Sequence, residues 1–154
     1  MSDGTVAVAG TNHTMPIVSC PSCGKRNRVP VVASGTPRCA SCHHDLPWVV
    51  DAGSAEFDEA TRSRLPVLVD LWAPWCGPCR IVAPGVERAS QELAGRLKVV
   101  KVDVDQAPDV STRFGVQGIP TLLVLRDGTP VARQVGALPP DRLVEWVRSV
   151  LQAA

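Results

Sequence analysis

Six cysteines occur in this chain of 154 residues, and they fall into three Cys-x-x-Cys pairs. The third pair, Cys76 and Cys79, follows the apolar run VLVDLW at 67–72 and encloses only Gly77 and Pro78. The run predicts a buried strand and the next residues a helix start, where proline is tolerated in the first turn. Unpaired N–H groups and the helix dipole there favour the thiolate of the first cysteine. The pattern predicts dithiol–disulfide chemistry, with Cys76 as the more exposed, attacking thiol and Cys79 as the resolving thiol.

The other four cysteines form two pairs near the N-terminus, separated by fifteen residues. A Cys-x-x-Cys turn aims two thiolates at one point, so two turns across a short hairpin complete a tetrahedral zinc site. A core this small cannot fold alone, and zinc would contribute directly to its folding. Three alternatives stay open: two disulfides, haem attachment at CASCH (39–43), or idle thiols. The spacing favours one structural zinc ion bound by Cys20, Cys23, Cys39 and Cys42.

The segment around these two pairs carries cations and one strand-like stretch. Gly24 can take the positive φ that such a turn needs, and the apolar residues 29–32 predict a strand between the turns. A zinc tetrathiolate carries about two excess negative charges, which nearby cations offset. We prefer that interpretation to a nucleic-acid-binding ribbon for the basic residues Lys25, Arg26, Arg28 and Arg38. His43 and His44 are expected at the surface, because four cysteines fill the site.

Two charged residues lie inside apolar strands. Asp70 is embedded in VLVDLW, where burial disfavours the charged form of a carboxyl and raises its pKa. Lys101, in VVKVDVD at 99–105, is the expected partner if the two strands are neighbours. The alternatives are an Asp70 side chain that reaches water and a Lys101 stem that only covers apolar surface.

These motifs resemble the thioredoxin family. The resemblance rests on WCGPC at 75–79, Asp70 six residues before the first cysteine, Lys101, GIPT at 118–121 and VGA at 135–137. It covers residues from about 49 to the C-terminus. Together with CPSC and CASC, it makes the chain similar to the bacterial thioredoxin 2 type, which carries an N-terminal zinc site.

The resemblance implies roles for individual residues. Asp70 would accept the proton of the buried thiol, with Lys101 beside it. Pro120 would be a cis proline that faces the cysteines and lets Ile119 pair with a substrate main chain. Trp75 would shape the surface around Cys76, with Gly77 and Pro78 completing the turn. The implied activity is protein disulfide reduction, with electrons arriving from NADPH through thioredoxin reductase.

Composition excludes several other classes of protein. The net charge of +1 recruits neither nucleic acid nor a membrane surface, and no apolar stretch approaches the roughly 18 residues that span a bilayer. The N-terminal residues resemble no secretory signal, so we expect a cytoplasmic monomer with disulfide-containing client proteins as partners. No nucleotide or flavin motif is present, so we expect neither cofactor. The alternative functions are an oxidant or isomerase, and a zinc-ribbon adaptor.

The expected organisation is a disordered tail (1–16), a zinc ribbon (17–46) and an α/β domain with a central mixed sheet flanked by helices (47–154). Ser54 is expected to cap a helix whose inner stripe is Phe57, Ala60, Arg64 and Leu65. Pro84 is expected to kink the helix that begins at Gly77. Further elements are expected at 97–104 (strand), 107–114 (helix), 121–125 and 131–135 (a hairpin around Asp127-Gly128), with a last helix through 143–151.

Overall fold

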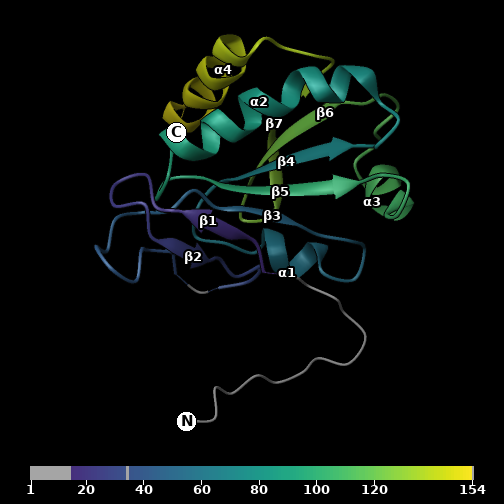
Figure 1. Ribbon diagram of the computed structural model, residues 1–154. Helices are drawn as coiled ribbons and strands as arrows, with labels where there is room; N and C mark the ends of the chain where they lie inside the picture. Colours follow the sequence, from purple (N-terminus) through teal and green to yellow (C-terminus); the bar gives the residue numbers. More distant parts are fainter. Residues whose placement is uncertain (1–14, 34, 154) are drawn as a thin grey trace.

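The computed structural model describes residues 15–33 and 35–153, so the expected disorder of residues 1–14 lies outside the described part (Figure 1). The elements are β1 (Ile17–Ser19), β2 (Arg26–Arg28), β3 (Val49–Asp51), α1 (Phe57–Thr61), β4 (Val67–Trp72), α2 (Gly77–Glu92), β5 (Lys98–Asp103), α3 (Pro108–Arg113), β6 (Thr121–Arg126), β7 (Thr129–Val135) and α4 (Pro140–Gln152). Within the two described ranges, every helix is too short or too polar to cross a membrane.

A five-stranded mixed sheet forms the centre of the molecule, in the order β3-β5-β4-β6-β7. β5 pairs in parallel with both β3 and β4, whereas β6 pairs antiparallel with β4 and β7. The parallel pair β4–β5 is joined through α2, as a strand–helix–strand unit requires. Asp127 and Gly128 both have positive φ, so they form the two-residue turn that the Asp-Gly signal predicted between β6 and β7. The expected mixed sheet is confirmed.

Different groups of elements cover the two faces of the sheet (Figure 1). α2 and α4 pack on one face, where α2 and its C-cap residue bury an apolar stripe: Val82, Val86, Ala89 and Leu93. On the other face, α1 and the ribbon that contains β1 and β2 share one apolar cluster with the sheet. α2 contains Pro84 and is one continuous helix from Gly77 to Glu92.

The ribbon packs against the sheet, and the expected strand at 29–32 is wrong. The strands of the ribbon are β1 and β2, which pair antiparallel, and residues 29–33 form an arm without strand pairing. Pro30 has no N–H to donate, and the arm pairs with the domain instead. The carbonyl of Pro30 accepts from Trp48 Nε1 at 2.8 Å, and the carbonyl of Val31 accepts from Lys98 Nζ at 2.6 Å.

The first helix of the domain differs from the predicted one. α1 begins at Phe57 and ends at Thr61, so the predicted continuation to Arg64 and Leu65 is wrong. Ser54 does not cap it, because its hydroxyl donates to Asp109 instead. Glu56 stands at the cap position, and its carboxylate accepts from the Gly53 N–H at 2.8 Å.

Candidate dithiol site and metal centre

The third cysteine pair lies at the start of α2, directly after the buried strand β4. Cys76 is the N-cap residue of α2 and Cys79 lies in its first turn, so the chain places both sulfurs at the positive end of a 16-residue helix. The two residues form a disulfide across Cα atoms 5.3 Å apart. The Cys76 sulfur also accepts from the Cys79 N–H at 3.2 Å, which caps the helix. Gly77 and Pro78 are exposed between them.

The expected difference in exposure between the two cysteines is wrong for this oxidised form. Cys76 is 3% exposed and Cys79 is 7% exposed. Both pack with Ala73, and the half-buried Ile119 covers this cluster from the loop before β6.

The loop before β6 contains a cis peptide bond between Ile119 and Pro120. Pro120 is buried, and its carbonyl accepts from the N–H of Gly136 at 2.9 Å. Gly136 has a φ of +90°, a conformation that favours glycine. This loop contributes Ile119 to the surroundings of the disulfide, which is the position that the GIPT motif implied.

Asp70 is a buried carboxyl on the face of the sheet that α2 covers. It is 3% exposed, and burial raises its pKa to about 6, with Lys101 opposing this shift and Asp51 adding to it. Its Oδ1 atom has no hydrogen-bond partner among the described residues. Asp70 pairs directly with Lys101 across β4 and β5, as the sequence led us to expect for neighbouring strands. The site therefore holds a carboxyl whose pKa lies well above its ordinary value of 3.8.

Trp75 is 69% exposed beside the disulfide, and a residue that sequence reasoning missed holds its ring. Its Nε1 donates to Asp105 Oδ2 at 2.8 Å. Asp105 follows β5, and its own N–H donates to Asp103 Oδ1 at 2.9 Å. The pattern Asp-x-Asp at the end of a strand was the available signal, because an aspartate there readily forms such a turn.

The four N-terminal cysteines converge, and the geometry of their sulfurs fits a metal. All four Sγ atoms lie within 4.8 Å of one another. Two pairs across the ribbon are at 3.5 Å (Cys20 with Cys42) and 3.6 Å (Cys23 with Cys39). A tetrahedral Zn²⁺ with Zn–S bonds of about 2.3 Å needs sulfurs about 3.8 Å apart. The donor set therefore fits Zn²⁺ in size and chemistry.

The two ribbon turns have the same local construction. Each begins at a cysteine whose carbonyl accepts from the residue four positions later, Gly24 in one turn and His43 in the other, at 2.9 Å in both. Both residues that donate, Gly24 and His43, have positive φ, as expected for Gly24. The N–H of Cys42 is the largest influence that lowers the pKa of the Cys39 thiol, to about 6, against the opposing effect of burial. His43 and His44 are exposed, as expected.

Asn27, on β2, joins the two turns and was not singled out from the sequence. Its Nδ2 donates to the carbonyl of Lys25 at 2.8 Å and to Cys39 Sγ at 3.5 Å. Its Oδ1 accepts from the Ala40 N–H at 2.9 Å. A buried asparagine between two metal-type turns is a recognisable signal, because ligand sulfurs need such outer hydrogen bonds.

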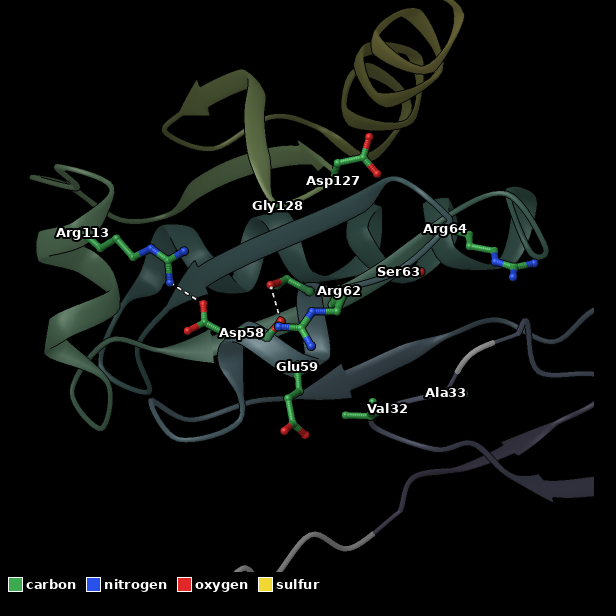
Figure 2. A pocket seen from close by; sticks show the side chains of 11 residues that line it. Val32, Ala33, Asp58, Glu59, Arg62, Ser63, Arg64, Arg113, Asp127 and Gly128 are labelled. Carbon is green, nitrogen blue, oxygen red and sulfur yellow. Dashed lines mark hydrogen bonds and ion pairs between the residues drawn. The ribbon is translucent and has the colours of Figure 1, made fainter.

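A hollow of about 870 Å³ lies away from both cysteine sites (Figure 2). It is bordered by α1, the β6–β7 turn and the arm of the ribbon. Asp58 and Arg113 point toward one another at its rim and form an ion pair. None of the predicted catalytic or metal-binding residues lines it. The hollow therefore does not change the assignment of the site to the two cysteine clusters.

The fold and the dithiol site together define a class of protein. A disulfide in the first turn of a helix, a buried carboxyl on the adjacent strand and a cis-proline loop beside it are the parts of a thiol–disulfide oxidoreductase. Comparison with known proteins gives the same class.

Residues 48–149 match the family model described as thioredoxin, and the chain belongs to the thioredoxin family. Among curated relatives, thioredoxin of Haemophilus influenzae is 43% identical over 100 residues, which are 64% of this chain and 94% of the relative. Thioredoxin of Synechocystis sp. is 45% identical over 105 residues, 68% of this chain and 96% of the relative. Thioredoxin of Bacillus subtilis is 45% identical over 103 residues, 67% of this chain and 98% of the relative. The family match begins after the four ribbon cysteines.

Proposed function

We propose that this protein reduces disulfides of client proteins. The observation that carries the proposal is the Cys76–Cys79 disulfide at the N-terminus of α2, on the same face of the sheet as the buried Asp70. Relatives named thioredoxin, 41–49% identical, support it. The Gly-Pro pair between the cysteines favours a reductase over the alternative, an oxidant or isomerase.

The proposed reaction moves two electrons from the dithiol to the client. The Cys76 thiolate attacks one sulfur of the client disulfide, and the other client sulfur leaves as a thiolate. The Cys79 thiol then gives its proton to Asp70 and attacks the Cys76 sulfur of the mixed disulfide. The second client sulfur also leaves as a thiolate, and Cys76–Cys79 is a disulfide. The two client thiolates become a dithiol by taking up one proton from solvent and the one that Asp70 releases to solvent.

The surrounding residues have proposed roles in binding and proton transfer. Lys101, the strand partner of Asp70, would stabilise its ionised form. The buried Pro120 would leave Ile119 free to pair with an extended client main chain. Trp75 and Ile81, at 69% and 56% exposure, would give the client apolar contact area. Gly77 and Pro78 would keep side-chain bulk away from the attacking sulfur.

Electrons must reach the disulfide from another protein, because the chain has no motif for a nucleotide or flavin. We propose thioredoxin reductase, supplied by NADPH, as the donor, and the cytoplasm as the compartment. We expect a monomer that binds neither nucleic acid nor membranes.

We further propose one structural zinc ion held by Cys20, Cys23, Cys39 and Cys42, as in the thioredoxin 2 type. Convergence of the four sulfurs within 4.8 Å supports it. When bound, Zn²⁺ would cross-link the two turns and stabilise the ribbon. The alternative is an adaptor in which the ribbon binds a macromolecule and the domain is only a scaffold.

The test is the reduction potential of Cys76–Cys79 in the zinc-loaded protein, equilibrated through NADPH and thioredoxin reductase. The reduction potential of thioredoxin is about −270 mV, and that of a strong periplasmic oxidant is about −120 mV. We expect a value near the first, and no coupling in Cys76→Ser. A value near the second would reverse the proposed electron flow, and failure of the wild type to couple would favour the adaptor.

A further inference from the structure

The row of charged residues across the sheet extends one strand beyond Asp70 and Lys101. Register pairs Asp70 on β4 with Lys101 on β5, and Lys101 with Asp51 on β3. Directly paired residues project to the same face of a sheet. The three side chains therefore form one lateral row on the face that α2 covers, with the cation in the middle.

Exposure increases along this row from the centre of the sheet to its edge. Asp70 is 3% exposed, Lys101 is half-buried and Asp51 is exposed. β3 is an outer strand of the five-stranded sheet, so Asp51 lies at a sheet edge. The row thus leads from the buried carboxyl to solvent.

A groove of about 750 Å³ opens at that end of the row. It runs between residues 16–21 of the ribbon and residues 83–91 of α2, and both Asp51 and Lys101 line it. Asp70 does not line it. Water in the groove therefore reaches the outer carboxylate and the ammonium, whereas the inner carboxyl lies outside the lining of the groove.

Among the described residues, Lys101 forms an ion pair with neither Asp70 nor Asp51. In the described ranges it has no ion pair, and its Nζ lies 5.3 Å from the centre of the Trp72 ring. The lysine stem is flexible, so an ammonium between two carboxylates divides its time between them. Each carboxylate is then stabilised less than if the ammonium stayed beside it.

We propose that Asp51 is a positioning residue of the dithiol site, which acts by sharing the Lys101 ammonium with Asp70. This keeps the buried carboxyl able to take up the Cys79 proton at neutral pH. The inference rests on the proposed reductase reaction. The pKa of Asp70, which burial raises, Lys101 lowers and Asp51 raises, agrees with the row.

Other titratable groups on this face are placed differently. Glu87 of α2 lines the same groove but has no register partner in the row. Asp103 of β5 is engaged by the N–H of Asp105. Cys20, a proposed zinc ligand, forms part of the groove wall, and the β6 residue opposite Asp70 is the apolar Leu122. Glu87 is therefore the matched control for an acid in the groove.

The experiment measures the protonation of the Asp70 carboxyl directly. In the full-length zinc-loaded protein, the infrared band of the protonated Asp70 carboxyl, identified by its loss in Asp70→Asn, is titrated with pH. Asp51→Asn is expected to move its midpoint down by about half a pH unit at low salt, the size expected for one partly screened charge. Glu87→Gln is expected to move it by less than half as much. With Lys101→Met as background, Asp51→Asn is expected to lose most of its effect.

The pH profile of client reduction gives the functional readout. The acid limb of the single-turnover rate is expected to shift down in Asp51→Asn by the same amount, and the plateau is expected to fall by about twofold or less, because a carboxylate of lower pKa is a weaker base. The zinc content is expected to stay unchanged. Three results would overturn the inference. They are an Asp70 midpoint that Asp51→Asn does not move, an equal shift of this midpoint in Glu87→Gln, and a shift by Asp51→Asn that stays as large in the Lys101→Met background. A shifted midpoint in a protein that reduces no disulfides would leave the charge row intact and overturn the proposed function instead.

Discussion

The two cysteine sites of this protein use the same four-residue spacing in different backbone settings. At 76–79 the spacing lies on a helix, where Cys76 caps the first turn and the sulfurs join as a disulfide. At 20–23 and 39–42 it lies on turns that reverse through a residue with positive φ, Gly24 or His43. The helix brings the two sulfurs of one pair together, whereas the turns bring two pairs together.

The surroundings separate the two sites further. The dithiol has a buried carboxyl on the preceding strand and an exposed Trp75 beside it, which we propose as its proton acceptor and part of its docking surface. The ribbon sulfurs receive hydrogen bonds from backbone N–H groups and from Asn27. These donors favour the thiolate form of the cysteines, but they cannot accept a proton from a thiol. The comparison teaches that a Cys-x-x-Cys pair takes its chemistry from what faces it.

The largest expected effect comes from removing one cysteine from each site. Cys79→Ser is expected to stop turnover by on the order of a thousandfold and to trap clients on Cys76, because no thiol remains to resolve the mixed disulfide. Cys39→Ser is expected to lose zinc and unfold the ribbon, while client reduction stays within a few-fold. Turnover, trapped adducts on gels and bound zinc are measured. Equal loss of turnover in both variants would show that the sites are not separate.

Removing the buried carboxyl should stabilise the dithiol domain. The folded-state pKa of Asp70 is about 6 and its ordinary value is 3.8. The folded state therefore prefers the protonated form, and stability falls as pH rises from about 4 through 6. Asp70→Asn is expected to raise the free energy of unfolding by up to about 3 kcal/mol at pH 7.5, and hardly at all near pH 3.5. It should also slow the resolving step about tenfold or more.

Urea unfolding at the two pH values checks this prediction. Asp127→Asn is the control, because that exposed turn residue should change stability by no more than about 0.5 kcal/mol at either pH. A gain for Asp70→Asn that does not depend on pH would contradict the assignment.

Lys98 tests how the ribbon arm is held on the domain. It is fully buried, its ammonium lies 4.2 Å from the centre of the Trp48 ring, and burial lowers its pKa to about 8. Below pH 8 the folded protein bears the full cost of the buried charge, and this cost fades as pH rises toward the ordinary value of 10.5. Relative to Lys98→Met, the wild type should therefore gain on the order of 1 kcal/mol between pH 7.5 and 9.5.

Lys98→Arg is the matched variant, because a guanidinium stays charged over this range and should show no such gain relative to Lys98→Met. Denaturant midpoints at each pH give the comparison. The same upward trend in Lys98→Arg would assign the effect to another group.

The smallest expected effect concerns the two ribbon turns. Gly24 has a φ of +77° and His43 a φ of +64°. Gly24→Ala should weaken zinc binding by about fivefold, because alanine costs about 1 kcal/mol in this conformation even though its Cβ would meet no atom within 4 Å. His43→Gly should strengthen binding by a smaller factor. Competition with a chelator measures both. Stronger binding in Gly24→Ala or weaker binding in His43→Gly would contradict the similarity of the turns.

Local patterns in the sequence predicted the parts of the dithiol site that depend on neighbours along the chain. The strand, the helix start at Gly77 and the Asp-Gly turn are short-range features, because each depends on a few adjacent residues. The pairing of Asp70 with Lys101 was also predictable, since both lie in strands joined by one helix. The domain limits at 17–46 and 47–154, and the roles of the site residues, stay predictions.

Tertiary structure decided what depends on contacts between distant segments. The local pattern at 29–32 predicted a strand, but in the structure the carbonyls of this arm accept hydrogen bonds from the side chains of Trp48 and Lys98 instead. Ser54 does not cap the first helix, because its hydroxyl donates to Asp109, which is distant in the sequence. Cys76 packs against Ile119, which also belongs to a distant loop. The amino-acid sequence defines which chemical groups are present and how they are spaced along the chain. Tertiary packing defines which of these groups lose water and which come into contact, because burial of a charge or a sulfur depends on contacts between segments that are distant in the sequence.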